Sequence, residues 1–181
     1  MPIEIEKKYR LSAEQQTQIL GRLPEIGARK TANEFEENTL YGGDAIDTER
    51  CVLRLRRVGE KGTLTFKERY PTESDIKHQQ EDETTVGDPE AMAAILDALG
   101  FIPILIYEKR RETWTLETLE IVIDELPFGL FMEIEGNEAG IREVESKLAI
   151  KGLKGETLSY PRLTLKHGVS NAGVIEARFV K

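Results

Sequence analysis

The chain has 181 residues, of which 39% are apolar and 32% are charged, and its formal net charge is −8. This length fits one compact α+β domain over residues 1–181, and the apolar content is too high for a disordered chain. The acidic balance argues against a surface that coats nucleic acid or anionic lipid, because affinity for phosphate backbones comes mainly from Lys and Arg. One cysteine and two histidines exclude an intrachain disulfide and a Cys/His zinc site.

The start of the chain lacks the apolar core of a secretion signal. No run approaches the roughly 20 apolar residues that a membrane-spanning helix requires. We therefore expect a cytoplasmic protein with no membrane partner and no nucleic-acid partner. The sequence leaves open whether the protein forms a homodimer.

The first half of the chain is rich in strand patterns. A strand is expected over residues 2–11, because apolar and charged side chains alternate there with a period of two. Ser12 and Gln15 have the spacing of a capping box, which predicts a helix that stops between Gly21 and Pro24. Further strands are expected over residues 31–41, 51–58, 62–69 and 78–86.

A well-marked helix opens the second half. Asp88 is a natural N-cap, Pro89 occupies the first helical position, and Gly100 lies just beyond the last apolar residue. The remaining expected elements are strands over 102–114, 117–124 and 130–135, a helix from Asn137 and a short helix from Ser159. The total is about eight strands and three or four helices.

Charged residues repeat at every second position of these strands. Alternation puts each set on one face of its strand, while the opposite face is mostly apolar. Taken singly, each set fits a strand that exposes its charges to water. The acidic residues are Glu4, Glu6, Glu81, Glu83, Asp124, Glu133 and Glu135, and the basic residues are Lys8, Arg54, Arg56, Lys67, Arg69, Lys109 and Arg111.

Taken together, the sets favour a closed sheet. If the sheet forms a small barrel with helices packed outside, the apolar faces meet the helices and the charged faces line the lumen. Burying so many charges is costly unless they pair or serve ligands. Clustered carboxylates suit Mg²⁺ or Mn²⁺, and Arg and Lys suit phosphate oxygens, so the expected ligand is a metal-bound polyphosphate.

The same residues carry a resemblance to a known family. Glu4-x-Glu6-x-Lys8 resembles the Glu-x-Glu-x-Lys signature of the CYTH superfamily, also called triphosphate tunnel metalloenzymes. Later segments resemble the other motifs of the family in the same order. They are Arg54-Leu55-Arg56, Leu64-Thr65-Phe66-Lys67, Glu81-x-Glu83, Lys109-x-Arg111, Asp124-Glu125-Leu126-Pro127, Phe131-x-Glu133-x-Glu135 and Leu158-Ser159-Tyr160.

This resemblance implies an eight-stranded antiparallel β-barrel, with helices packed outside, that binds a triphosphate-containing small molecule and divalent cations. By position, it implies these metal ligands: Glu4, Glu6, Glu81, Glu83, Asp124, Glu133 and Glu135. It also implies these phosphate-binding residues: Lys8, Arg54, Arg56, Lys67, Lys109 and Arg111. Arg69 is added from strand alternation alone.

The resemblance does not choose one reaction. Members of the superfamily hydrolyse inorganic triphosphate, thiamine triphosphate or nucleoside triphosphates, or cyclise ATP. By resemblance to hydrolytic members, Lys67 helps to activate the attacking water, and Tyr41 is a second catalytic candidate. The contexts of Lys109 and Asp124 are similar to class IV adenylyl cyclases, so formation of cyclic AMP and pyrophosphate is the alternative.

Hydrolysis is favoured over cyclisation because it needs fewer features. Glu4 also lies so near residue 1 that we expect the His-Phe-containing extension of those cyclases to be absent. A non-catalytic binder of polyphosphate or nucleotide is the third interpretation. It is disfavoured because phosphate binding requires only the cations, whereas the acidic set indicates metal-assisted turnover.

Overall fold

A computed structural model describes residues 3–69 and 77–180 of the chain. The first half contains β1 (Ile3–Leu11), α1 (Ala13–Glu25), β2 (Arg29–Gly42), β3 (Cys51–Val58), β4 (Lys61–Arg69), β5 (Lys77–Val86) and α2 (Pro89–Ala98). The second half contains β6 (Ile102–Leu116), β7 (Leu119–Leu126), β8 (Gly129–Glu135), α3 (Glu138–Lys147), α4 (Tyr160–His167), β9 (Val169–Asn171) and β10 (Val174–Ala177).

The helices begin where the sequence predicts. The Ser12 hydroxyl accepts from the Gln15 backbone N–H at 3.2 Å, and the Gln15 side chain accepts from the Ser12 N–H at 2.8 Å, which completes the capping box. Asp88 and Asn137 cap α2 and α3 by accepting from the N–H three residues on. None of the helices in the described ranges has the length and apolar character needed to cross a membrane.

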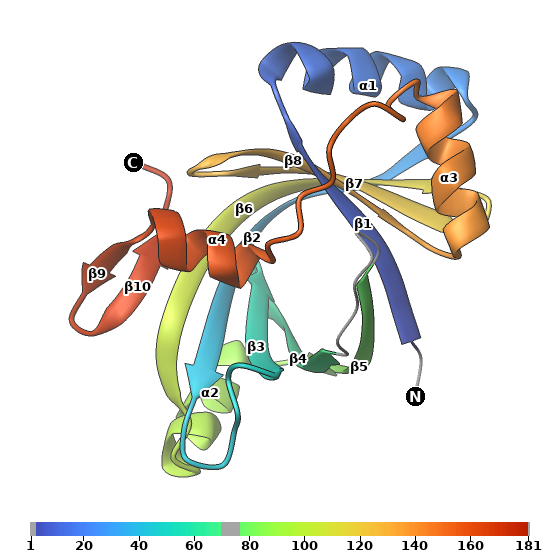
Figure 1. Cartoon of the computed structure of the whole chain (residues 1–181). Helices are drawn as coiled ribbons and strands as arrows, with labels where there is room; N and C mark the ends of the chain where they lie inside the picture. Colours follow the sequence, from blue (N-terminus) through green and yellow to red (C-terminus); the bar gives the residue numbers. More distant parts are fainter. Residues whose placement is uncertain (1–2, 70–76, 181) are drawn as a thin grey trace.

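Eight strands form a ring of paired neighbours (Figure 1). The pairing runs β2-β3-β4-β5-β1-β8-β7-β6, and β2 also pairs with β6, so the last strand of the series meets the first. Every pairing around this ring is antiparallel. The predicted eight-stranded antiparallel barrel of an α+β fold is confirmed.

The C-terminal segment has more structure than the predicted short helix. After α4 the chain forms a hairpin of β9 and β10, and β10 pairs in parallel with β6, where Ile175 lies opposite Leu105. These strands have three and four residues. They are too short for an alternation pattern to develop, so only α4 could be predicted from Ser159 onward.

Helices cover two parts of the outer face of the barrel (Figure 1). α1 and α3 pack on outward side chains of β1, β7 and β8, and Leu23, Ile121 and Ile141 are fully buried there. α2 packs on β3 and β4, where Leu55 and Leu96 are buried together. The apolar strand faces therefore meet helices, as the barrel hypothesis requires.

The lumen is apolar at one end. At this end the inward positions of the strands hold Leu40, Leu105, Tyr107, Leu126 and Phe131. Tyr160 and Leu163 of α4 pack among these side chains, so α4 closes this end of the barrel. The charged positions follow on the same faces of the same strands, toward the other mouth.

Candidate active site

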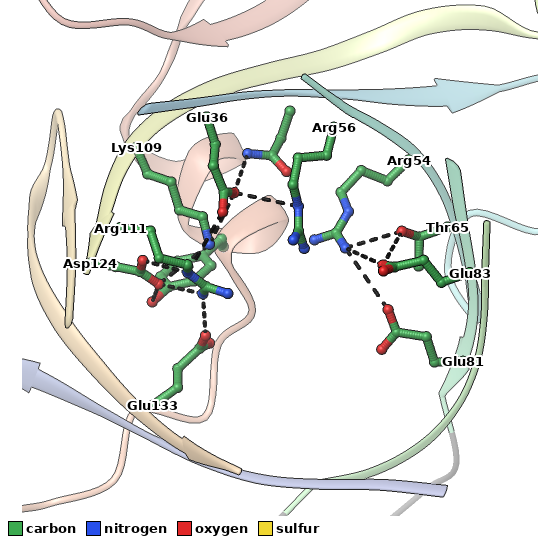
Figure 2. Close-up of polar contacts among 12 residues, drawn as sticks. Glu36, Arg54, Arg56, Thr65, Glu81, Glu83, Lys109, Arg111, Asp124 and Glu133 are labelled. Carbon is green, nitrogen blue, oxygen red and sulfur yellow. Dashed lines mark hydrogen bonds and ion pairs between the residues drawn. The ribbon is translucent and has the colours of Figure 1, made fainter. Parts of the chain in front are cut away.

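The alternating charged side chains point into the barrel (Figure 2). Strand pairing places residues that are distant in the sequence side by side: Arg54 lies opposite Thr65, Thr65 lies opposite Glu83, and Arg111 lies opposite Asp124. Figure 2 shows two groups on facing walls, one around Asp124 and one around Arg54. The antiparallel register therefore converts separate sequence motifs into one polar lumen.

Asp124 is the centre of the first group and is fully buried. Arg111 donates two hydrogen bonds to it, with Nε 2.8 Å from Oδ1 and Nη2 2.6 Å from Oδ2. The Tyr160 hydroxyl donates to Oδ2 at 2.7 Å. Burial, together with Asp124 and Glu133, raises the pKa of Tyr160 well above its ordinary value, so its hydroxyl stays a proton donor.

Glu133 joins this group to Lys8. Its Oε2 accepts from Arg111 Nη2 at 2.8 Å, and its Oε1 lies 3.1 Å from Lys8 Nζ. The Lys8 ammonium also lies 3.7 Å from the centroid of the Tyr160 ring. Burial alone would lower the pKa of Lys8, but Glu133 and Glu6 raise it above the ordinary value, so Lys8 stays a cation in the interior.

The second group surrounds Arg54 and Lys67. Arg54 Nη2 donates to the Thr65 hydroxyl at 3.2 Å and lies 3.9 Å and 4.0 Å from the carboxylates of Glu81 and Glu83. Thr65 in turn donates to Glu83 at 3.0 Å. Lys67 Nζ lies 2.6 Å from Glu81 Oε2, so its ammonium is in direct contact with an acid.

Glu36 connects the two groups, although the sequence patterns do not single it out. Its buried carboxylate lies 3.3 Å from Lys109 Nζ, 3.5 Å from Arg56 Nε and 3.8 Å from Arg111 Nε. Burial alone would raise the pKa of Glu36, but these cations hold it well below its usual range. Glu36 and Glu37 are adjacent acids on opposite faces of β2, so alternation cannot tell which one points inward.

Lys109 is buried between carboxylates and guanidinium groups. Its Nζ lies 3.3 Å from Glu36 and 3.4 Å from Asp124. Burial and the neighbouring Arg111 lower the pKa of Lys109 to about 8, against the opposing effect of Asp124 and Glu36. Lys109 therefore changes its charge much closer to neutral pH than an ordinary lysine does.

Two lumen arginines have buried Nε–H groups without a hydrogen-bond acceptor among the described residues. These are Arg54 and Arg56. Arg57 has the same property, but its guanidinium lies outside the barrel and pairs with Glu90 at 2.6 Å. A buried donor without an acceptor is costly, and an anion in the lumen would supply the missing acceptors.

The predicted metal ligands lie in different surroundings. Asp124 and Glu133 already pair with cations, as described above. Glu6 and Glu135 lie directly opposite each other on β1 and β8. Two opposed carboxylates offer only oxygen donors, and an all-oxygen donor set suits Mg²⁺ or Mn²⁺, so this position fits a divalent cation.

The metal ligands are not gathered into a preformed cluster. Over residues 3–69 and 77–180, no three described acidic, histidine or cysteine side chains come together as a metal centre. Glu4 pairs through its backbone on β1, but its side chain lies outside the described atoms, as does that of Arg69. The first position of the Glu-x-Glu-x-Lys motif therefore stays a prediction.

Tyr41 does not line the lumen. It is buried under α2 with Leu55 and Leu96, on the outer side of the barrel. A register shift between Leu40 and Tyr41 in the β2–β6 pairing accompanies this placement. Tyr41 therefore lies away from the charged lumen, and this position does not support its predicted catalytic role.

Comparison with known proteins decides the family. A family model of the CYTH domain matches residues 2–162. The chain belongs to the CYTH family. No match is found among curated proteins.

Solved structures from three different organisms have the same fold. PH1012 from Pyrococcus horikoshii OT3 is 25% identical, with a TM-score of 0.77 over 88% of this CYTH chain and 98% of its own. A candidate adenylate cyclase from Vibrio parahaemolyticus is 20% identical, with a TM-score of 0.70 over 89% and 97%. HpAC1 from Hippeastrum, a candidate adenylyl cyclase with a dominant triphosphatase activity, is 20% identical, with a TM-score of 0.69 over 91% and 94%. At these identities the last two establish the shared fold.

Proposed function

We propose that this CYTH protein is a divalent-cation-dependent triphosphatase that hydrolyses a phosphoanhydride bond of inorganic triphosphate or of an organic triphosphate. The observation that supports it most is a set of cations gathered in one lumen, two of which have Nε–H groups without acceptors among the described residues. A triphosphate is a linear polyanion that supplies charge and acceptors along its length. The cations are Lys8, Arg54, Arg56, Lys67, Lys109 and Arg111.

Cations from two strands on either side of β2 would share the phosphate chain. Arg54 and Arg56 reach from β3, and Lys109 and Arg111 reach from β6. Phosphoryl transfer depends mainly on positioning and on neutralising the charge that develops on the leaving oxygen. Cations fixed on the two strands that flank β2 provide both, because the barrel holds them in place before the ligand arrives.

Lys67 is the residue that we assign to the attacking water. Its ammonium is fixed against the wall by the 2.6 Å contact with Glu81, so it has little freedom to reorient. From that position it would hold the water in line with the terminal phosphorus. Attack breaks the terminal phosphoanhydride bond and gives orthophosphate, the shorter anion and a proton.

The opposed acids of β1 and β8 would hold the divalent cation. Glu6 and Glu135 are the described members of this set, and Glu4 is the predicted third. When bound, Mg²⁺ or Mn²⁺ would screen the phosphate charge and polarise a phosphoryl oxygen. The protein residues then need only to orient the chain and the water.

Adenylate cyclisation is the second candidate, because the Vibrio relative with this fold is a candidate adenylate cyclase. HpAC1, in contrast, has a dominant triphosphatase activity. Cyclisation requires a binding site for the ribose and the base beside the triphosphate. Tyr160 and Leu163 fill one end of the lumen, so a nucleoside would have to lie at the other mouth, whereas hydrolysis requires only the charged segment.

A product assay tests the proposal. The full chain is incubated with inorganic triphosphate, thiamine triphosphate or ATP, with Mg²⁺, Mn²⁺ or EDTA, and phosphate, pyrophosphate and cyclic AMP are measured. Metal-dependent release of phosphate without cyclic AMP supports the triphosphatase. Cyclic AMP with pyrophosphate from ATP would replace it with the cyclase, and no product from any triphosphate would leave only a binding protein.

A further inference from the structure

Glu36 is a carboxylate placed among the cations that a phosphate chain needs. It is 1% exposed and lies on β2 directly opposite Lys109 of β6. Figure 2 shows it between Lys109 on one side and Arg56 on the other. A phosphate that enters this part of the lumen therefore meets a resident negative charge.

The contacts of Glu36 are those of a counter-ion and not of a tight structural pair. Its distances to the three cations are 3.3 Å, 3.5 Å and 3.8 Å, and it accepts a hydrogen bond from Asn38 Nδ2 at 3.2 Å. Asp124, by comparison, accepts from Arg111 at 2.6 Å and 2.8 Å. Arg111 and Lys109 therefore keep an acidic partner without Glu36.

Arg56 depends on Glu36 more strongly. Among the described residues, the acid within ion-pair distance of Arg56 is Glu36. The Arg56 Nε–H still has no hydrogen-bond acceptor among the described residues, and the Oδ1 of buried Asn38 has no donor among them. Glu36 thus balances the charge of Arg56 without accepting a hydrogen bond from its Nε–H. The guanidinium therefore remains available to a better-placed anion.

A resident carboxylate penalises short anions more than long ones. Orthophosphate or pyrophosphate can occupy only part of the lumen, where Glu36 already neutralises Arg56 and Lys109 and repels the newcomer. A triphosphate alone has a central phosphate, which carries one negative charge where a terminal phosphate carries up to two. With that central phosphate beside Glu36, the triphosphate meets less repulsion there, and its two ends reach cations on the remaining walls. The lumen therefore attracts a triphosphate more strongly than it attracts pyrophosphate or orthophosphate.

On this basis we propose that Glu36 is a specificity-determining residue: an internal anion that makes the tunnel prefer a chain of three phosphates to pyrophosphate and orthophosphate. This inference rests on the proposed triphosphate site, because it assumes that phosphate occupies the lumen. The same effect would promote product release, because the anions left after hydrolysis are the ones whose binding Glu36 disfavours.

The test compares affinities within one series of anions. Tripolyphosphate, pyrophosphate and orthophosphate are titrated calorimetrically at pH 7 in EDTA, so that no turnover occurs, with the wild type and Glu36→Gln. The amide removes the charge and keeps the shape, so pyrophosphate affinity is expected to rise about tenfold, and tripolyphosphate affinity by much less. Glu36→Asp keeps the charge and is expected to keep the wild-type preference.

Glu37→Gln is the matched control, because Glu37 lies next in the sequence but pairs with Arg178 outside the lumen. An unchanged ratio of tripolyphosphate to pyrophosphate affinity in a folded Glu36→Gln protein overturns the inference and leaves the triphosphate site standing. Loss of all anion binding in that variant also overturns it, in favour of a purely structural role. If wild type neither binds tripolyphosphate in EDTA nor releases phosphate from it with Mg²⁺ or Mn²⁺ present, the proposed function fails as well.

A second variant covers the case in which Glu36→Gln does not fold. Asn38→Asp adds a carboxylate beside Glu36 on the same face of β2, so it tests the same effect with the opposite sign. Pyrophosphate affinity is expected to fall at least severalfold more than tripolyphosphate affinity. An equal fall for both anions would contradict a role for negative charge in discriminating between them.

Discussion

Arg111 and Asp124 form a two-point ion pair inside the barrel, at 2.8 Å and 2.6 Å, although Asp124 has no exposed surface. Asp124 also accepts from the Tyr160 hydroxyl of α4, so the pair connects β6, β7 and the helix that closes the lumen. A buried charge is tolerable only while its partner is present. This relationship makes Arg111 a structural residue as well as a phosphate-binding one.

We predict that Arg111→Met lowers the free energy of unfolding by about 3–5 kcal/mol, because Asp124 would lose its principal partner without gaining solvent. Urea unfolding followed by circular dichroism measures the loss. Arg110→Met is the control: Arg110 is the next residue, faces outward and pairs with Glu125 in an exposed position, so its removal should cost less than about 1 kcal/mol. Equal losses in both variants would contradict the assignment.

Arg56 and Arg57 offer a second comparison of adjacent residues. Arg56 points into the lumen toward Glu36, whereas Arg57 pairs outside with Glu90. Arg56→Ala should raise KM for the triphosphate about 10- to 100-fold, the value of one charge-assisted contact, and Arg57→Ala should leave KM within about twofold. Steady-state kinetics decide it, and a rise in KM only for the Arg57 variant would place the ligand outside the barrel.

The barrel could be predicted because alternation is a local signal. A period of two fixes which side chains share a face, and helices with capped ends supply the partners for the apolar faces. The antiparallel ring then follows, since charged faces that converge in a lumen explain the whole set better than separate solvated strands. The pairs of opposed residues, such as Lys8 and Glu133, follow from register, which the sequence does not specify.

The residues that escaped prediction are those for which alternation is ambiguous or absent. Glu36 and Glu37 place acids on both faces of β2, so alternation alone does not show which acid enters the lumen. Tyr160 reaches Asp124 from a helix, so no strand pattern marks its contact with the site. The apolar end of the lumen was not predicted either. Its inward side chains look like ordinary core residues in the sequence, and only the position of α4 shows that they line one end of the lumen.

Lys67 is the residue that we expect to orient the attacking water. Lys67→Ala should lower kcat for triphosphate hydrolysis about 100-fold or more, because the attacking water would lose its fixed partner beside Glu81. The control is Lys61→Ala, since Lys61 is exposed at the start of β4 near the β3–β4 turn. If kcat is unchanged and only KM rises, Lys67 binds phosphate but does not orient the water.

Glu135 tests the metal position. Glu135→Gln should raise the Mg²⁺ or Mn²⁺ concentration needed for half-maximal activity by about tenfold or more, because Glu6 would lose the opposed carboxylate across the β1–β8 pair. Metal titrations of the initial rate measure this, and EDTA should abolish turnover. Glu143→Gln on the exposed side of α3 is the control. An unchanged metal requirement in the Glu135 variant would remove this residue from the site.

The ionisation of Lys109 determines the pH dependence that we expect for kcat/KM. Its pKa of about 8 lies below that of an ordinary lysine because of burial and Arg111, with Glu36 and Asp124 opposing the shift. The protonated form, which attracts phosphate, therefore predominates below pH 8 and is lost as pH rises through that value. Since kcat/KM reports ionisation of the free enzyme, we predict that kcat/KM for a triphosphate falls above about pH 8.

Lys109→Arg identifies the group responsible for that fall. A guanidinium keeps its charge across this range, so the decline in kcat/KM should move to higher pH by at least one unit, even if the maximal rate is lower. Lys30→Arg is the matched control, because Lys30 lies on β2 in an exposed pair with Glu112 and should leave the profile unchanged. If the decline stays near pH 8 in Lys109→Arg, another group in the lumen titrates there, and the tunnel's affinity for phosphate does not depend on the charge of Lys109.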